Sequence, residues 1–195
     1  LRSLPDSFFS YLDSFRFSGS VWSVEEGTPM FSAEPILRLR APVVEAQLIE
    51  TALLSIIDFQ TAVASKAARL VLAADDRGVV EFGGRRAHGP EAAQQAARAS
   101  FIAGVRATSN VEASRRYAIP VMGTMGHEFV KLCSSEAQAF QYYSKAFPSD
   151  TLLLIDTVNA TQATRQAVAF GESLHGVRID AGDILAVSQE VRGVL

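Results

Sequence analysis

The sequence predicts an α/β fold in which short parallel strands alternate with helices. Four short apolar segments occur in order, at residues 78–82 (GVVEF), 119–123 (IPVMG), 151–156 (TLLLID) and 175–180 (HGVRID). Helical stretches follow them at 90–104, 134–147, 160–174 and 184–195. Such alternation is typical of parallel strands joined by right-handed crossovers, in an open sheet or a barrel. The chain has 195 residues, 48% of them hydrophobic, and can bury one sizeable core.

The first part of the chain differs from this pattern. Residues 18–42 are punctuated by glycine and proline and rich in β-forming residues, which predicts a small β-rich layer. Residues 43–75 then place apolar side chains at nearly helical spacing, which predicts one long helix or two helices joined near Asp58. Further on, Pro90 after Gly89 is a favourable helix start, because proline at the first helical position loses no needed N–H.

Composition excludes several classes of function. The 18 basic and 21 acidic side chains give a net charge of −3, without the basic stripe that a nucleic acid requires. Cys133 is the only cysteine, so the chain has no internal disulfide and no multi-cysteine metal site. No secretory signal and no uncharged apolar run of membrane-spanning length is evident, so we expect a cytoplasmic protein without a membrane partner. Because the first residue is leucine, we expect a segment of a longer protein.

The residues that follow the predicted strands are the candidates for function. They read GGRRAHG after the first strand, GTMGHE after the second, DTVN after the third and DAGD after the fourth. The carboxyl ends of parallel strands form one rim, where ligands bind. Arg85 and Arg86 suit phosphate oxygens, His127 is titratable, and Asp180 and Asp183 suit hydroxyls or a cation.

Each candidate also has a structural interpretation. The two arginines could pair with surface carboxylates, His127 could be a hydrogen-bonded structural histidine, and Asp183 could cap the helix that starts near Ile184. The chain has no GxGxxG or GxxxxGK[ST] nucleotide motif, no GxSxG elbow and no zinc spacing among its histidines. The functional interpretation depends on all of these candidates lying at the same rim of the predicted sheet.

Six ordered blocks of the sequence resemble the nicotinate phosphoribosyltransferase family. They cover residues 11–51, 58–74, 81–104, 108–130, 152–157 and 176–183, and include EFGGRRAHG, GTMGHEFV and GVRIDAGD. The resemblance implies a portion of an irregular parallel α/β barrel, with residues 1–75 in a β-rich N-terminal domain plus a long connecting helix and 76–195 forming the first β–α units. It also implies a homodimer that joins nicotinate to 5-phosphoribosyl 1-pyrophosphate, with ATP as co-substrate and Mg2+ as cofactor.

The resemblance assigns roles residue by residue. It implies His127 as the histidine that ATP phosphorylates and Asp180 as the carboxylate that orients ribose. The implied substrate-binding residues are Phe82 (stacked on the pyridine ring), Arg85, Arg86, Ser109, Thr124 and Arg178, and no residue is assigned to a metal. The chain departs from the commoner family pattern at Asp58, Gly126, Glu128 and Ala181.

Three alternatives remain open at this point. A relative that uses nicotinamide carries an acidic residue in the region of TSN, residues 108–110, where this chain has Ser109. A quinolinate-type transferase needs a more basic pocket. A non-catalytic fragment or paralogue would act as a partner-binding module through an exposed barrel edge.

Overall fold

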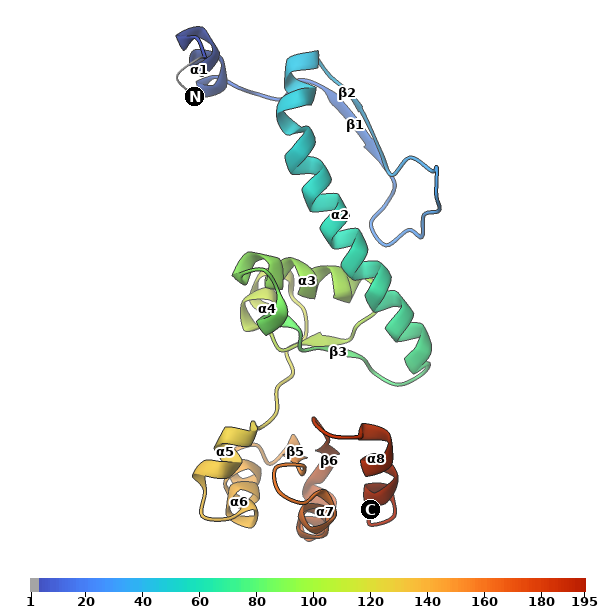
Figure 1. Ribbon diagram of the computed structural model, residues 1–195, viewed down its shortest axis with the longest axis vertical. Coiled ribbons are helices and arrows are strands. Elements are labelled where there is room, and N and C mark those ends of the chain that lie inside the picture. The colour runs from blue at the N-terminus through green and yellow to red at the C-terminus, as the bar shows by residue number, and fades with distance from the viewer. Residues whose placement is uncertain (1–3) are drawn as a thin grey trace. The chain divides into compact units, whose positions relative to one another are not determined.

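The computed structural model describes residues 4–195, which form two compact units (Figure 1). The first unit extends to Met122 and the second comprises Gly123–Leu195. The first contains α1 (Asp6–Asp13), β1 (Ser20–Ser23), β2 (Leu37–Arg40), α2 (Val43–Ala74), β3 (Val80–Glu81), the 3-10 turn η1 (Gly84–Arg86), α3 (Pro90–Ile102), β4 (Ala107–Thr108) and α4 (Val111–Tyr117). The second contains α5 (His127–Leu132), α6 (Glu136–Ala146), β5 (Thr151–Leu154), α7 (Ala160–Val168), η2 (Gly171–Ser173), β6 (Leu174–Arg178) and α8 (Ile184–Arg192).

The β-rich layer is a two-stranded antiparallel hairpin. β1 and β2 pair from Ser20 opposite Arg40 to Ser23 opposite Leu37. The chain then enters α2 through Pro42. Glu45, which is buried in the first turn of α2, accepts hydrogen bonds from the backbone N–H and the hydroxyl of Ser18, at 2.7 and 2.8 Å. This carboxylate therefore fixes the segment before β1 against the start of the long helix.

Residues 43–74 form one continuous helix, α2, so the alternative of two helices joined near Asp58 is wrong. In Figure 1 this helix runs beside the β1–β2 hairpin and on to α3. Much of its length is exposed. By length and composition alone α2 could cross a membrane, a test that core helices of soluble proteins also pass. It carries Glu45, Asp58 and Lys66 along its length.

The strands β3 and β4 form a parallel pair in the first unit. Glu81 lies opposite Thr108, and Thr108 in turn bridges to Val121 in parallel. Helix α3 begins at Pro90 as expected, after Gly89, whose φ of +107° suits glycine. Strand β4 was not predicted, because two residues are too short to show an alternating pattern.

Helix α3 is tied to the loop between β1 and β2 by Arg98. Its guanidinium donates two hydrogen bonds to Glu26, at 2.6 and 2.8 Å, and a third to Gln60 of α2 at 3.3 Å. The hydrogen bond from Arg98 lowers the pKa of the Glu26 carboxyl. The same guanidinium lies 5.8 Å from the ring centre of Tyr117 in α4. One side chain thus connects four segments of the first unit.

The second unit is built on the parallel pair β5–β6. Leu152, Leu153 and Leu154 lie opposite Gly176, Val177 and Arg178. Its core packs β5 against α6, α7 and α8, and consists chiefly of Phe140, Leu153, Leu154, Ile155, Ala163, Ala167 and Val191. The run LLLI at 152–155 is apolar because this strand is largely covered on both faces.

The mixed helix and strand content confirms the α/β class, and every strand pair described beyond α2 is parallel. The strands anticipated at 78–82, 151–156 and 175–180 occur as β3, β5 and β6, while 119–123 contributes the single bridge at Val121. Helix α2 ends at Ala74 and the compact units divide after Met122. The domain boundary predicted between residues 75 and 76 stays a prediction.

Candidate functional site

In the second unit, side chains that follow three different segments meet around His127. His127 is the first residue of α5, Asp156 follows β5, and Arg178 and Asp180 lie at and just after the end of β6. The four residues are separated by up to 53 positions in the sequence, yet their side chains form one connected group. The carboxyl ends of β5 and β6 therefore hold a histidine, two carboxylates and a guanidinium.

Asp156 is the centre of this group. Its side chain is 7% exposed, and its Oδ2 accepts hydrogen bonds from the backbone N–H groups of Asp180 and Ala181, at 2.6 and 2.7 Å. Its Oδ1 lies 3.1 Å from Nε2 of His127. Because a carboxylate only accepts hydrogen bonds, Nε2 must carry the proton in this contact. When His127 is neutral, Nδ1 is then the nitrogen with a free lone pair.

Nδ1 of His127 faces the carboxylate of Asp180, which is paired with the guanidinium of Arg178. Nδ1 lies 3.9 Å from Oδ2 of Asp180, and Oδ1 of Asp180 pairs with Nη2 of Arg178 at 2.8 Å. Arg178 also donates to the backbone carbonyl of Met125 at 3.3 Å, which ties the end of β6 to the turn before His127. The guanidinium offsets the negative charge of Asp180 beside the imidazole.

Two residues near His127 have other contacts. The Thr124 hydroxyl is 3.5 Å from the carbonyl of Leu152 in β5, which fixes the turn that precedes the histidine. Glu128 is exposed and accepts from Lys131 at 3.2 Å. Asp156, and not Glu128, is thus the carboxylate that orients the imidazole. Asp156 is the first residue of the DTVN segment that follows the third predicted strand, but it was not assigned a role among the predicted site residues.

The residues around Asp180 also show why Ala181 is tolerated. Its contact with Asp156 is through the backbone N–H, which any residue except proline supplies. Gly182 follows with a φ of +79°, a conformation that favours glycine. Asp183 caps α8 by accepting from the N–H of Ala186 at 3.1 Å, so its structural interpretation is confirmed.

The remaining predicted residues belong to the first unit. Phe82 directly follows β3 and Ser109 directly follows β4, so the two lie at the carboxyl ends of paired parallel strands. The backbone N–H of Ser109 donates to the carbonyl of Glu81 at 2.9 Å. Arg85 and Arg86 lie in η1, which begins after Phe82 and Gly83, and both are exposed.

The arginines of η1 are not engaged by surface carboxylates. Among the ion pairs within residues 4–195, none involves Arg85 or Arg86. Two adjacent exposed guanidinium groups after a strand are suited to binding an anion such as a phosphate or a carboxylate. The interpretation that they form surface ion pairs is therefore wrong for the part of the chain that the structure describes.

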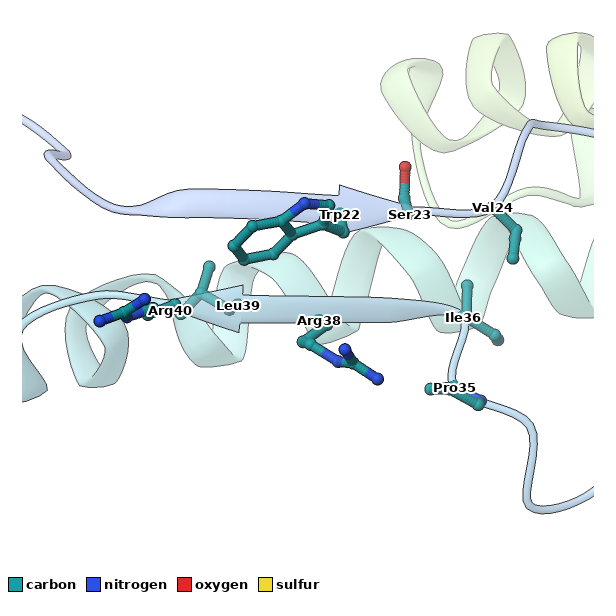
Figure 2. A pocket seen from close by; sticks show the side chains of 8 residues that line it. All are labelled: Trp22, Ser23, Val24, Pro35, Ile36, Arg38, Leu39 and Arg40. Carbon is teal, nitrogen blue, oxygen red and sulfur yellow. The ribbon is translucent and has the colours of Figure 1, made fainter.

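A separate hollow of about 450 Å3 lies on the β1–β2 hairpin. Figure 2 shows the eight residues that line it, Trp22, Ser23, Val24, Pro35, Ile36, Arg38, Leu39 and Arg40. None of them is acidic or a histidine, and none was a predicted site residue. The hollow therefore offers no acid–base or nucleophilic chemistry comparable to that around His127.

Metal ligands are sparse in the described residues. Nowhere in residues 4–195 do three or more His, Cys, Asp or Glu side chains gather as a metal site would require. Mg2+ is commonly bound through one or two carboxylates together with substrate phosphates. The described residues therefore do not form a metal cage made of protein ligands alone.

Fold and site together define an α/β protein with a cluster of polar side chains at the carboxyl ends of two parallel strands. Residues 1–58 match the nicotinate phosphoribosyltransferase N-terminal domain, and residues 78–193 match the nicotinate phosphoribosyltransferase family. The chain belongs to the nicotinate phosphoribosyltransferase family.

Individual relatives agree with this assignment. The chain is 43% identical to nicotinate phosphoribosyltransferase pncB2 of Mycobacterium tuberculosis, over all of this chain and 43% of that protein. It is 44% identical to nicotinate phosphoribosyltransferase of Bacillus subtilis, over 89% of this chain and 37% of that protein. It thus spans less than half the length of these relatives.

Two solved structures are similar over most of the chain. Human nicotinic acid phosphoribosyltransferase has a TM-score of 0.83 and 29% identity, covering 99% of this chain and 50% of that one. Nicotinate-nucleotide pyrophosphorylase from Pyrococcus furiosus has a TM-score of 0.86 and 27% identity, covering 92% of this chain and 48% of that one.

Proposed function

We propose that the complete protein joins nicotinate to 5-phosphoribosyl 1-pyrophosphate, giving nicotinate mononucleotide and pyrophosphate in NAD biosynthesis, with ATP hydrolysis coupled to the transfer. The observation that carries this proposal is the His127–Asp156 contact of 3.1 Å in a chain of this family. It supports His127 as a nucleophile with a fixed tautomer. The proposal places the reaction in the cytoplasm, in a homodimer whose subunits contain an irregular α/β barrel.

The transfer step needs no covalent intermediate with the protein. The pyridine nitrogen of nicotinate forms a bond to C1 of the ribose while the bond from C1 to the pyrophosphate oxygen breaks. Positive charge develops on the ribose and negative charge on the leaving group. Arg85 and Arg86 are suited to stabilise the leaving group, and Asp180 to orient the ribose hydroxyls. Mg2+, when bound with the substrate, would neutralise part of the pyrophosphate charge.

The ATP step follows from the tautomer of His127. With its proton on Nε2 and shared with Asp156, the imidazole can attack the terminal phosphorus of ATP through Nδ1. A phosphorus–nitrogen bond forms, the bond to the ADP oxygen breaks, and water later hydrolyses the phosphohistidine. Asp156 stabilises the positive charge that the ring acquires, because it is buried and hydrogen-bonded to Nε2.

Ser109 supports nicotinate as the substrate over nicotinamide. Its backbone is fixed beside Glu81, at the end of the strand next to Phe82. An uncharged hydroxyl there does not repel the carboxylate of nicotinate, whereas an acidic residue would. Thr124 and Arg178 complete the proposed set of substrate-binding residues, and Phe82 is proposed to stack on the pyridine ring.

One assay tests the proposed function. The complete protein is incubated with nicotinate, nicotinamide or quinolinate, plus 5-phosphoribosyl 1-pyrophosphate and Mg2+, with and without ATP, and mononucleotide is quantified. We expect product from nicotinate, with ATP increasing its yield. Product only from nicotinamide or quinolinate, or none from any of the three, contradicts the proposal.

A His127→Asn variant of the complete protein tests the ATP step. Its phosphate incorporation from labelled ATP should vanish, whereas transfer without ATP should persist in part. The matched control is His88→Asn, because His88 is exposed and lies outside the cluster. If His127→Asn incorporates phosphate as well as the unmodified protein does, His127 has a structural role only.

A further inference from the structure

Beyond the site around His127, the carboxylate of Glu81 lies at a strand end, and none of the ion pairs within residues 4–195 involves it. Glu81 is the last residue of β3 and lies opposite Thr108, the last residue of β4. Its Oε2 accepts a 2.6 Å hydrogen bond from the hydroxyl of Thr108, and its Oε1 accepts a hydrogen bond from the backbone N–H of Gly83. Both carboxylate oxygens are thus occupied by donors of the first unit.

The hydroxyl of Thr108 continues this connection. Thr108 is fully buried, and its Oγ1 accepts a 3.0 Å hydrogen bond from the backbone N–H of Asn110. Since a hydroxyl has one proton, which Thr108 donates to Glu81, the direction of each bond is fixed. Asn110 in turn caps α4 by accepting from the N–H of Ala113 at 3.0 Å. The connection runs from the turn at Gly83 through Glu81 and Thr108 to the start of α4.

These hydrogen bonds fix the relative positions of two candidate substrate-binding residues, Phe82 and Ser109. Phe82 lies between Glu81 and Gly83, the two residues joined across the turn. Ser109 lies between Thr108 and Asn110, which are joined in the same way. The Glu81–Thr108 hydrogen bond then links the two turns. A pyridine ring that stacks on Phe82 and presents its carboxylate to Ser109 requires a constant spacing between these two residues.

We propose that Glu81 is a positioning residue for the pyridine ring, acting through Thr108 to hold Phe82 and Ser109 at the spacing that nicotinate needs. This inference rests on the proposed function. Glutamine at position 81 cannot serve both donors in the same way, because its single carbonyl oxygen replaces only one of the two carboxylate oxygens. Valine at position 108 keeps the shape of threonine and removes the bridging hydroxyl.

The test uses the complete protein with Glu81→Gln, Thr108→Val, the double variant and Thr108→Ser, which retains the hydroxyl. We expect Glu81→Gln and Thr108→Val each to raise the KM for nicotinate about tenfold, as the loss of a hydrogen bond to a charged group would. The KM for 5-phosphoribosyl 1-pyrophosphate should change less than about twofold in Thr108→Val, which leaves the Gly83 contact intact. Thr108→Ser should behave as the unmodified protein.

The double variant and a surface control sharpen this test. The double variant should raise the KM for nicotinate no more than the stronger single variant, because both changes break one bridge. Glu91→Gln, an exposed carboxylate in α3, should leave both KM values unchanged. Equal increases in the two KM values, additive effects, or a Thr108→Ser variant as impaired as Thr108→Val would overturn the proposal.

Hydrogen exchange separates failure of this inference from failure of the proposed function. If the unmodified protein makes no mononucleotide, the proposed function fails and the positioning role fails with it, while faster amide exchange at Gly83 and Asn110 in the variants still establishes the bridge as structural. If the unmodified protein is active and the variants lose amide protection without a change in the KM for nicotinate, the positioning role alone is overturned.

Discussion

In the second unit, Asp156 is buried, receives two backbone N–H groups and binds His127, so the polar site is also part of the packed structure. In the first unit, Arg85 and Arg86 are exposed on a 3-10 turn and form no ion pair with any other residue from 4 to 195. The two units therefore differ in what stabilises their polar side chains: protein hydrogen bonds hold the cluster in the second unit, whereas the arginines of the first unit are exposed. The cluster around His127 is stabilised by the protein itself, and the guanidinium groups of Arg85 and Arg86 are available to an anionic ligand.

The comparison is tested most strongly by Asp156→Ala. The change leaves the N–H groups of Asp180 and Ala181 and the His127 ring without their acceptor. We expect the free energy of unfolding of the second unit to fall by about 2–4 kcal/mol, as for loss of a buried hydrogen-bonded charge. Activity of the complete protein should fall by about 100-fold. Thermal denaturation and steady-state kinetics measure the two effects, and Asp150→Ala, at an exposed residue, is the control. An unchanged stability would show that the site and the fold are independent in this unit.

The opposite outcome is expected for Arg85→Ala and Arg86→Ala. Because the two guanidinium groups are exposed and not ion-paired within the described chain, stability should change by less than about 0.5 kcal/mol. The KM for 5-phosphoribosyl 1-pyrophosphate or for nicotinate should rise about tenfold or more in at least one variant, through loss of a charge-assisted contact. Arg77→Ala, at an exposed arginine before β3, serves as the comparison. Destabilisation without a kinetic effect would remove the distinction between the two units.

A smaller effect is expected for Ser109→Asp. A carboxylate at this strand end would repel the carboxylate of nicotinate, so kcat/KM for nicotinate should fall by about tenfold in the complete protein. Ser109→Asn has nearly the same size without the charge and is the matched control. The two variants are compared with nicotinate and nicotinamide as substrates. Identical kinetics for both would show that position 109 is not near the ring.

The smallest effect concerns Glu136, in the first turn of α6. Burial raises the pKa of this carboxyl, while a hydrogen bond from the backbone N–H of Val158 acts in the opposite direction. The folded state therefore holds the proton more tightly than the unfolded state, and the contribution of Glu136 to stability is full at low pH. This contribution is lost as the pH rises through the folded-state pKa.

The measurement is the melting temperature between about pH 4 and pH 7, a window that covers the ordinary pKa of a glutamate and the range above it. Glu136→Gln should flatten the dependence of the melting temperature on pH, relative to the unmodified protein. Glu172→Gln, at an exposed glutamate in η2, should leave it unchanged. A Glu136→Gln profile parallel to that of the unmodified protein would contradict the assignment.

The sequence was most informative where patterns are long or chemically marked. The apolar spacing of α2, the Gly89–Pro90 helix start and the buried run of β5 each predicted an element that the structure contains. Elements without such a pattern were not anticipated. The two-residue β4 and the six-residue α5 are too short to show a period, and their form depends on tertiary contacts.

The same limit applies to the site. His127 and Asp180 were identified as candidates because they follow predicted strands, and the structure places them in one group. Asp156 also follows a strand, but its three hydrogen bonds come from residues 24, 25 and 29 positions away, which no local pattern encodes. Glu81 was overlooked for a similar reason, since its partner Thr108 is 27 positions distant. Both carboxylates act through long-range hydrogen bonds.

The contacts of Asp156 have a consequence for folding kinetics. Its partners Asp180 and Ala181 are only 24 and 25 positions away, across one strand–helix–strand connection. The entropy of closing such a loop grows slowly with its length, so this connection costs little more than a shorter one. The step that pairs β5 with β6 is also the step that brings the carboxylate to the N–H groups of Asp180 and Ala181. We therefore expect the Asp156, Asp180 and Ala181 part of the cluster to form as β5 pairs with β6, while His127 joins it from the preceding helix α5.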